Sequence, residues 1–182
     1  MIRKRVALLA AVLGLFDEIQ AASFVVSPTQ SIQSTIDAAV AGDNITVQSG
    51  IYNENLTITK ALDIRGVGGA VLATGTLTIT GVTAPVYIAD ISFGKLGASG
   101  VTVAASSNVR FDRCQLVGGG ALTGTGSTLY VYKGTFDQNV DFTGCTWTFQ
   151  RSTVVGSIAS SNSVAKCIAS VANSFTHTLG EL

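Results

Sequence analysis

Leu129-Tyr-Val-Tyr-Lys-Gly-Thr-Phe136 is the stretch from which the fold can be inferred, because its pattern recurs along the chain. Apolar side chains occupy its first, third and last positions. The same pattern appears in Val86–Phe93 and Val109–Leu116, continues from Trp147 to Val154, and returns more weakly in Ile168–Phe175. Alternation of apolar and polar residues indicates a β-strand with one buried face.

A second, shorter strand is expected between successive copies. It reads Leu56-Thr-Ile58, Leu77-Thr-Ile79, Val101-Thr-Val103, Leu122-Thr123 and Val140-Asp-Phe142. Gly and polar residues fill the gaps, as turns require. Short strands that repeat about every 20 residues are typical of a parallel β-helix, because each turn buries its inward side chains only against its neighbours. We therefore expect an all-β parallel solenoid of about six to seven turns.

Stacked turns should place equivalent residues in columns. The first position of the pattern gives one inward column: Ile45, Leu62, Val86, Val109, Leu129, Trp147 and Ile168. The last position gives another: Tyr52, Phe93, Leu116, Phe136, Val154 and Phe175. Because these aromatic side chains have the inward phase, we assign them to the core rather than to a ligand site.

A helix is expected before the first turn. Residues 31–41 alternate at helical spacing, with Ile32, Ile36, Ala39 and Val40 on one face. Ser31 suits the N-cap and Gly42 the stop. Such a helix would close the N-terminal end of the core and cover its strand edge. No equivalent follows Phe175, so the C-terminal end is expected to be open, truncated, or covered by a partner or a second copy.

The opening of the chain resembles right-handed parallel β-helix proteins of the pectin-lyase-like superfamily. The resemblance rests on Ser31–Ala39, Gly42–Val47, Gly50–Tyr52, Glu54–Ile58 and Leu62–Gly66. It implies the right-handed form of the fold and says less about activity, because that fold hosts lyases, esterases, hydrolases, binding proteins and adhesins.

The middle of the chain is faintly similar to a pectin methylesterase. Segments 89–93, 109–114 and 127–132 follow the order of strands around that family's site. The similarity implies catalytic carboxylates where this sequence has Gly126-Ser127 and Trp147, so the acid and the nucleophile are both missing.

A group of charged side chains falls on outward positions of one strand and the turn after it. The candidate ligand-binding residues are Tyr87, Asp90, Arg110, Asp112, Arg113, Tyr130, Tyr132, Lys133 and Arg151. Stacking should place Tyr87, Arg110 and Tyr130 in one column, and Asp90, Arg113, Lys133 and Arg151 in another. Tyrosine rings stack on sugars, and Arg and Lys pair with uronate carboxylates. A polysaccharide-binding face is therefore expected, with polar cover of an exposed sheet as the structural alternative.

Two other functions remain open at this point. Asp90, Asp112, Arg110 and Arg113 are the only plausible active groups for a polysaccharide lyase or esterase. Calcium would need more carboxylates than this stripe offers, so no metal or cofactor is expected. Threonines recur on the shorter strand, at Thr57, Thr78, Thr102 and Thr123, and such arrays resemble those of ice-binding solenoids. The second of these functions is therefore that of a structural or surface protein, which includes an ice-binding or adhesive solenoid.

Composition sets limits on partners and location. The 182 residues include 11 basic and 11 acidic side chains, so no excess of positive charge supports nucleic-acid binding. A basic start at Arg3–Arg5, an apolar run over 6–16 and small residues at Ala21–Ser23 predict a signal peptide and export, with no membrane anchor after cleavage. The expected segments are a signal peptide over 1–23, an N-terminal cap over 24–44, the β-helix over 45–176 and a tail over 177–182.

Three cysteines leave the redox question open. Cys114, Cys145 and Cys167 allow one disulfide with one thiol left over, or three buried thiols that act as small hydrophobic residues. The spacing of these cysteines does not match a metal site, and the single histidine, His177, lies near the C-terminus.

Overall fold

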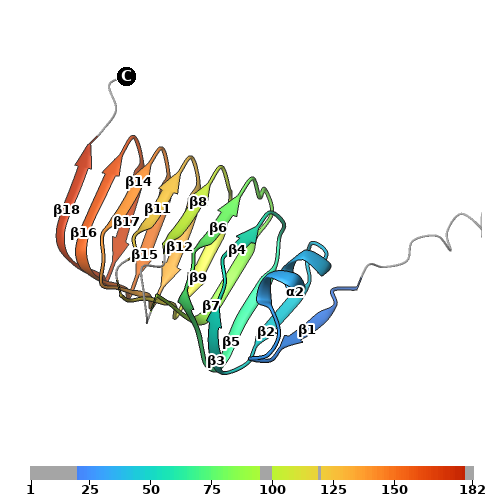
Figure 1. The fold of residues 1–182 in the computed structure, drawn as a ribbon. Helices are drawn as coiled ribbons and strands as arrows, with labels where there is room; N and C mark the ends of the chain where they lie inside the picture. Colours follow the sequence, from blue (N-terminus) through green and yellow to red (C-terminus); the bar gives the residue numbers. More distant parts are fainter. Residues whose placement is uncertain (1–19, 95–99, 119, 179–182) are drawn as a thin grey trace, which may run out of the picture.

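The computed structural model describes residues 20–94, 100–118 and 120–178, and shows a parallel β-solenoid of about seven turns. Figure 1 shows the turns stacked in sequence order, with one helix at the N-terminal end. Every strand pairing is parallel and joins one turn to the next. The expected fold class is confirmed. Of the expected signal peptide, residues 1–19 lie outside the described residues.

The strands form three faces, which we number in chain order. Face 1 contains β1 (Ser23–Val26), β2 (Asn44–Val47), the starts of β5 (Asp63–Thr74) and β7 (Val86–Phe93), β9 (Val109–Asp112), β12 (Thr128–Tyr132), β15 (Thr146–Gln150) and β17 (Val164–Ile168). Face 2 contains β3 (Gly50–Asn53), the ends of β5 and β7, β10 (Gln115–Leu116), β13 (Thr135–Phe136) and the starts of β16 (Thr153–Ser161) and β18 (Val171–Thr178).

Face 3 completes each turn. It contains β4 (Leu56–Ile58), β6 (Leu77–Thr80), β8 (Val101–Ala104), β11 (Leu122–Thr125), β14 (Val140–Thr143) and the ends of β16 and β18. Turn 1 thus begins with β2, turn 4 with β9, turn 5 with β12, turn 6 with β15 and turn 7 with β17.

The middle of the first core column is confirmed. Val86, Val109, Leu129 and Trp147 stack in register, and each is at most 2% exposed. The prediction was wrong at both ends of this column. Ile45 stacks on Ile64 rather than on Leu62. The pattern did not distinguish the two residues, because a shift of two residues keeps the same side chains inward. At the other end Ala165, not Ile168, follows Trp147.

The second core column is confirmed from Tyr52 to Val154, with Leu72 inserted between Tyr52 and Phe93. Its last member was wrong. Ala172 follows Val154, whereas Phe175 pairs with Ile158 on face 3. Around these columns Phe142, Trp147 and Phe149 pack with ring centroids 5.2 to 6.2 Å apart. The Trp147 indole donates to Ser160 Oγ at 3.0 Å, so its one polar atom is satisfied.

The N-terminal cap is helix α2 (Ile32–Ala38), which packs against β1, β2 and β4. Ser31 is the N-cap as expected, and its Oγ accepts from the Ser34 amide. Glu54, from the first turn, accepts hydrogen bonds from the Ile32 and Gln33 amides and so binds the helix start to the solenoid. The helix ends at Ala38, before the expected residue, and Val40 is exposed rather than buried.

The three cysteines are free. Cys114 and Cys145 are buried directly after two corners of the solenoid, where the equivalent residues of other turns are serines such as Ser152. Each thiol donates weakly to a nearby backbone carbonyl. Cys167 lies in an inward column of turn 7 and is exposed. Among the described residues, no helix has the length and hydrophobicity needed to cross a bilayer.

Candidate functional site

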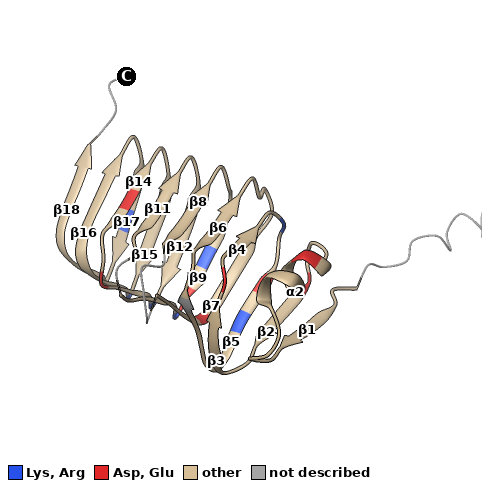
Figure 2. Ribbon diagram, in the orientation of Figure 1, with Lys and Arg blue, Asp and Glu red and all other residues tan. Residues whose placement is uncertain are grey.

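The candidate site covers the outward side chains of face 1 and the corner that follows it, which we call the charged face. Two of its columns run through face 1. The first is Asp63, Tyr87, Arg110, Tyr130, Thr148 and Lys166; the second is Arg65, Ala89, Asp112, Tyr132, Gln150 and Ile168. The expected stacking of Tyr87, Arg110 and Tyr130 is confirmed. Figure 2 shows how sparse charges are along the rest of the rod.

The corner forms a third column, which contains Asp90, Arg113, Lys133 and Arg151 as expected. Backbone hydrogen bonds link its turns in register: the Arg113 amide donates to Tyr132 O, and the Lys133 amide donates to Gln150 O. All four residues have a left-handed backbone, with φ between 51° and 57°. This conformation turns the chain from face 1 to face 2 and projects the four side chains from the edge of the rod.

A second corner, between faces 3 and 1, uses the same backbone conformation with different residues. Its positive-φ residues are Gly81, Ala105, Asn108, Gly126, Gly144 and Asn162. Gly and Asn adopt this conformation at little cost, whereas other residues lose about 1–2 kcal/mol each. The corner of the charged face therefore carries Arg113, Lys133 and Arg151 in a conformation that glycine adopts at lower cost.

Arginine side chains cover the tyrosine rings of the charged face. The Arg110 guanidinium carbon lies 5.4 Å from the Tyr87 ring centroid and 5.1 Å from that of Tyr130. Arg65 lies 4.7 Å from the Tyr87 centroid, and the Lys133 ammonium lies 5.2 Å from that of Tyr132. Because cations already contact these rings, a sugar could stack on them only by displacing an arginine or a lysine.

Asp112 is not exposed, contrary to the outward position expected for it. It is 4% exposed and lies under three neighbours. Tyr87 donates its hydroxyl to Asp112 Oδ2 at 2.7 Å, Arg113 Nη1 donates to Oδ1 at 2.9 Å, and Arg110 Nη2 lies 3.6 Å from Oδ2. Burial and the hydrogen bond to Asp112 raise the pKa of Tyr87, so its phenol stays protonated. Asp112 therefore holds the charged face together.

Positive charge is unevenly distributed along the charged face. In turns 2 to 4 the acids are paired: Asp63 with Arg65 at 2.7 Å, and Asp90 with Arg113 at 2.6 Å. In turns 5 to 7, Lys133, Arg151 and Lys166 form no ion pair within the described residues. Sequence reasoning missed Lys166, because it placed turn 7 three residues too late; the alternation Ala165-Lys166-Cys167 was the available signal.

A shallow groove of about 450 Å³ borders the charged face at turns 2 to 4. It is lined by Gly66, Val67, Gly68, Gly69, Asp90, Ser92, Arg113 and Gln115. The glycines interrupt the pairing of β5 with β7 between Arg65 and Ala70, and this irregularity opens the groove. Its hydroxyl, amide and charged groups are suited to the hydroxyl groups of a sugar.

Asp90 is a poor proton donor at neutral pH. The Arg113 guanidinium donates two hydrogen bonds to Asp90 and holds the pKa of that carboxyl below its usual range. Of the positions that the esterase resemblance pointed to, Ser127 and Trp147 are buried. The described residues contain no group of three or more His, Cys, Asp or Glu side chains placed to hold a metal ion. The arrangement is suited to binding anions.

The threonines of face 3 stack as expected. One column is Thr57, Thr78, Thr102, Thr123, Asp141, Ala159 and Thr176; the other is Thr80, Ala104, Thr125, Thr143, Ser161 and Thr178. Asp141 is the only charged side chain in the two columns. Face 3 is therefore a nearly neutral surface of small hydroxyl and methyl groups along the rod.

Comparisons with models of known families, with curated proteins and with solved structures found no match to this chain.

Proposed function

We propose that this chain is an exported, non-catalytic module that binds acidic polysaccharide along the charged face. The observation that carries the proposal is the corner column of Arg113, Lys133 and Arg151 in left-handed conformation. Three cations held in a backbone conformation that costs each of them about 1–2 kcal/mol, while the other corner is mostly glycine and asparagine, are unexpected for simple polar cover.

The geometry of the column favours a long ligand over a single small anion. Successive turns of a β-solenoid are about 4.8 Å apart, so Lys133 and Arg151 repeat positive charge along the rod axis. Lys166 adds a third unpaired charge on face 1 in turn 7. A chain that carries one carboxylate on each sugar can contact several of these cations at once, and each contact strengthens the others by proximity.

Sugars fit the site better than nucleic acid does. The chain has no overall excess of positive charge, and phosphate backbones are bound by many cations together. The groove adds Ser92, Gln115 and the paired Asp90, which are groups that bind hydroxyls. The resemblance of residues 31–69 to pectin-lyase-like proteins also supports a polysaccharide ligand and export.

The test is binding to polygalacturonate and to a neutral polysaccharide by isothermal titration calorimetry. We expect binding to the acidic polymer that weakens as salt rises, and little binding to the neutral one. Lys133→Ala combined with Arg151→Ala should weaken binding about tenfold, equal to about 1.4 kcal/mol.

A matched control separates the site from net charge. Thr125→Glu combined with Thr143→Glu changes net charge by the same amount, but on face 3, and should leave binding nearly unchanged. Equal losses in both double variants would contradict a localised site. Release of unsaturated uronate from polygalacturonate, or of methanol from methyl-esterified pectin, by the unmodified chain would show an enzyme instead.

The register of the threonine columns supports a second candidate, an ice-binding face. Thr57, Thr78, Thr102 and Thr123 repeat in register over four turns, and a regular, weakly charged surface can order water over an extended area. The measurement is the growth of ice crystals in the presence of the chain. Thr102→Lys combined with Thr123→Lys should abolish any effect, and unaltered growth with the original chain would remove this candidate.

A further inference from the structure

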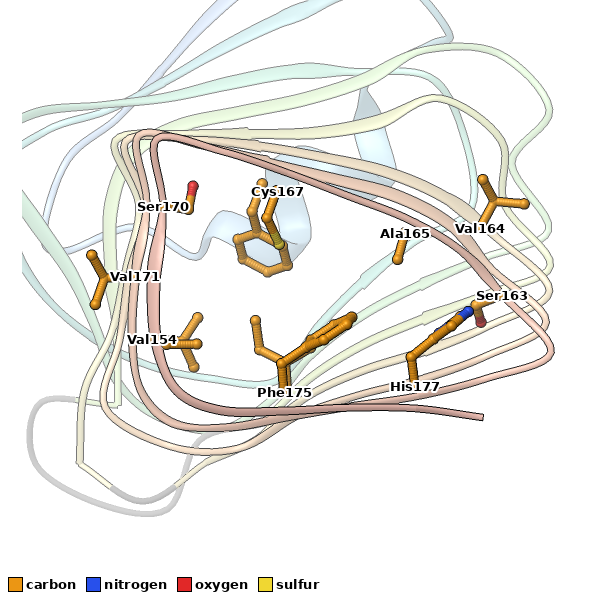
Figure 3. Close-up of a pocket in the computed structure, with 12 residues that line it drawn as sticks. Val154, Ser163, Val164, Ala165, Cys167, Ser170, Val171, Phe175 and His177 are labelled. Carbon is orange, nitrogen blue, oxygen red and sulfur yellow. The ribbon is translucent and has the colours of Figure 1, made fainter. Parts of the chain in front are cut away.

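The C-terminal end of the rod is an open cross-section of the core. A cavity of about 660 Å³ opens there, and Phe149, Cys167, Ala172, Phe175 and His177 are among its lining residues. Figure 3 shows the turns as nested three-sided loops, with Cys167, Phe175 and His177 inside and Val164 and Val171 outside. The opening thus has the size and outline of one turn of this solenoid.

The residues at this end have the phase of core residues without their burial. Phe175 continues the column of Val140 and Ile158, which are 0% and 3% exposed, yet Phe175 is 50% exposed. Cys167 likewise continues the column of Phe149, which is 1% exposed, yet Cys167 is exposed. Val164 and Val171 point outward at the rim of the opening and are 66% and 67% exposed. A contiguous apolar patch of this kind marks an interaction surface.

The strand edges at the same end lack partners within the described part of the chain. Each strand of face 1 from β2 to β15 pairs on both sides, as β15 does with β12 and β17, but within the described residues β17 pairs only with β15. Likewise β18 pairs only with β16. Their outer backbone groups can be satisfied by another strand that lies across the end.

We infer that a second copy of this chain covers the open end, so that two rods meet at their seventh turns about a two-fold axis. The occupant has to offer both an apolar cross-section of this outline and free strand edges, and the seventh turn of another copy offers both. Viewed from one fixed point on the rod axis, the strands of two copies related by a two-fold rotation run in opposite directions. Strands that meet across the interface would therefore be antiparallel, which is an efficient backbone pairing.

Charge permits this contact. Within residues 162–178 the only charged side chain is Lys166, which lies on the outward phase of β17. The end surface is therefore almost neutral, and two copies would not repel each other strongly. The same neutrality gives a strongly charged partner little to bind.

The opposite end of the rod limits the assembly to a pair. Helix α2 packs against β1, β2 and β4 and covers that end of the core, so an open seventh turn has no matching cross-section to stack on there. A closed dimer is therefore favoured over a head-to-tail filament. One turn per partner is a small interface, since specific interfaces usually involve about 20–30 residues a side, so we expect micromolar affinity.

The experiment is sedimentation of the purified chain across micromolar to millimolar concentrations. We expect a reversible shift from one to two copies, together with concentration-dependent protection of Cys167 from a maleimide. Cys114 and Cys145 are buried and serve as internal standards that stay unreactive in both states. A single copy at all concentrations, continued growth beyond two copies, or full reactivity of Cys167 in the two-copy state would overturn the inference.

Phe175→Asp tests the end surface directly. It should abolish the dimer, whereas Val155→Asp should not, because Val155 is 50% exposed like Phe175 but lies on the side of the rod. Circular dichroism checks that each variant folds. If Phe175→Asp does not fold, the protection of Cys167 in the unmodified chain still decides the question. Because Lys133 and Arg151 lie on another surface, Lys133→Ala with Arg151→Ala should dimerise normally, so this inference and the polysaccharide proposal fail separately.

Discussion

Arg113 holds Asp90 of the preceding turn through two hydrogen bonds, from Nε at 2.6 Å and from Nη2 at 2.7 Å. Both residues have a left-handed backbone, and both are partly exposed, at 45% and 39% of their side-chain surface. The same guanidinium reaches buried Asp112 at 2.9 Å. Arg113 thus connects the exposed corner column with the covered acid beneath the tyrosines.

Replacement of Asp90 should reduce stability in a pH-dependent way. Because Arg113 lowers the pKa of Asp90 in the folded state, the pair contributes stability above the ordinary aspartate pKa and loses it as pH falls through the lowered value. The pair is partly exposed, so we expect only about 0.2–1 kcal/mol. Asn tolerates the left-handed backbone, so Asp90→Asn tests the charge alone. Unfolding free energies of the two proteins should converge in acid; a constant difference at every pH would contradict this.

Arg151 should show the cost of its backbone conformation. With φ at 53°, Arg151→Gly should be more stable than Arg151→Ala by about 1 kcal/mol, although both lack the charge. Denaturant unfolding measures the difference. Thr148 lies in an extended strand of the same turn, and there the order should reverse, with Thr148→Ala more stable than Thr148→Gly. The same order at both positions would argue against strain at the corner.

The buried thiol of Cys114 should destabilise the fold in alkaline solution. Burial raises the pKa of this thiol to about 12, above its usual value of 9.0. Between these values the unfolded chain loses the proton and the folded chain keeps it, so stability falls by about 1.4 kcal/mol per pH unit. Burial also raises the pKa of Cys145 and Cys167, so Cys114→Ala should reduce the alkaline slope rather than remove it, with Cys167→Ala as the more exposed control. Equal slopes in all three proteins would show that Cys114 is not its source.

Gly66 should tolerate no side chain. A Cβ atom at this position would overlap the backbone oxygen of Asp90, which cannot move without disturbing the corner column. We expect Gly66→Ala to cost about 1–3 kcal/mol in thermal or denaturant unfolding. Gly81 offers a comparison, because a Cβ there meets nothing within 4 Å and adds only the strain of its positive φ. A smaller loss at Gly66 than at Gly81 would be unexpected.

The sequence predicted the solenoid, the N-cap at Ser31 and the stacking of turns 3 to 6, because a strong apolar alternation has one inward phase. Register was wrong at both ends for two reasons. The slip from Ile64 to Leu62 preserves that phase, so alternation cannot detect it. In turn 7 the inward residues Ala165 and Cys167 are weakly hydrophobic. The more hydrophobic Ile168 was therefore taken as the first position of the pattern, three residues too late.

The columns of the charged face could be predicted, but their interactions could not. Arg and Lys give no sequence signal for a left-handed backbone, so the strain at Arg113, Lys133 and Arg151 could not be predicted. The burial of Asp112 depends on Tyr87 and Arg113 folding over it from adjacent positions. The groove depends on the irregular pairing around Gly66, which alternation does not encode.

Sequential pairing also determines how the molecule opens. Each inner turn has strands on both sides, whereas turn 7 pairs only with turn 6 through β15 and β16. In a one-dimensional array of this kind, transient opening begins where a unit has a single neighbour and spreads inward one unit at a time. Backbone amides should therefore exchange with deuterium fastest in β17 and β18 and progressively more slowly towards the aromatic cluster around Trp147, so the rod would fray from one end.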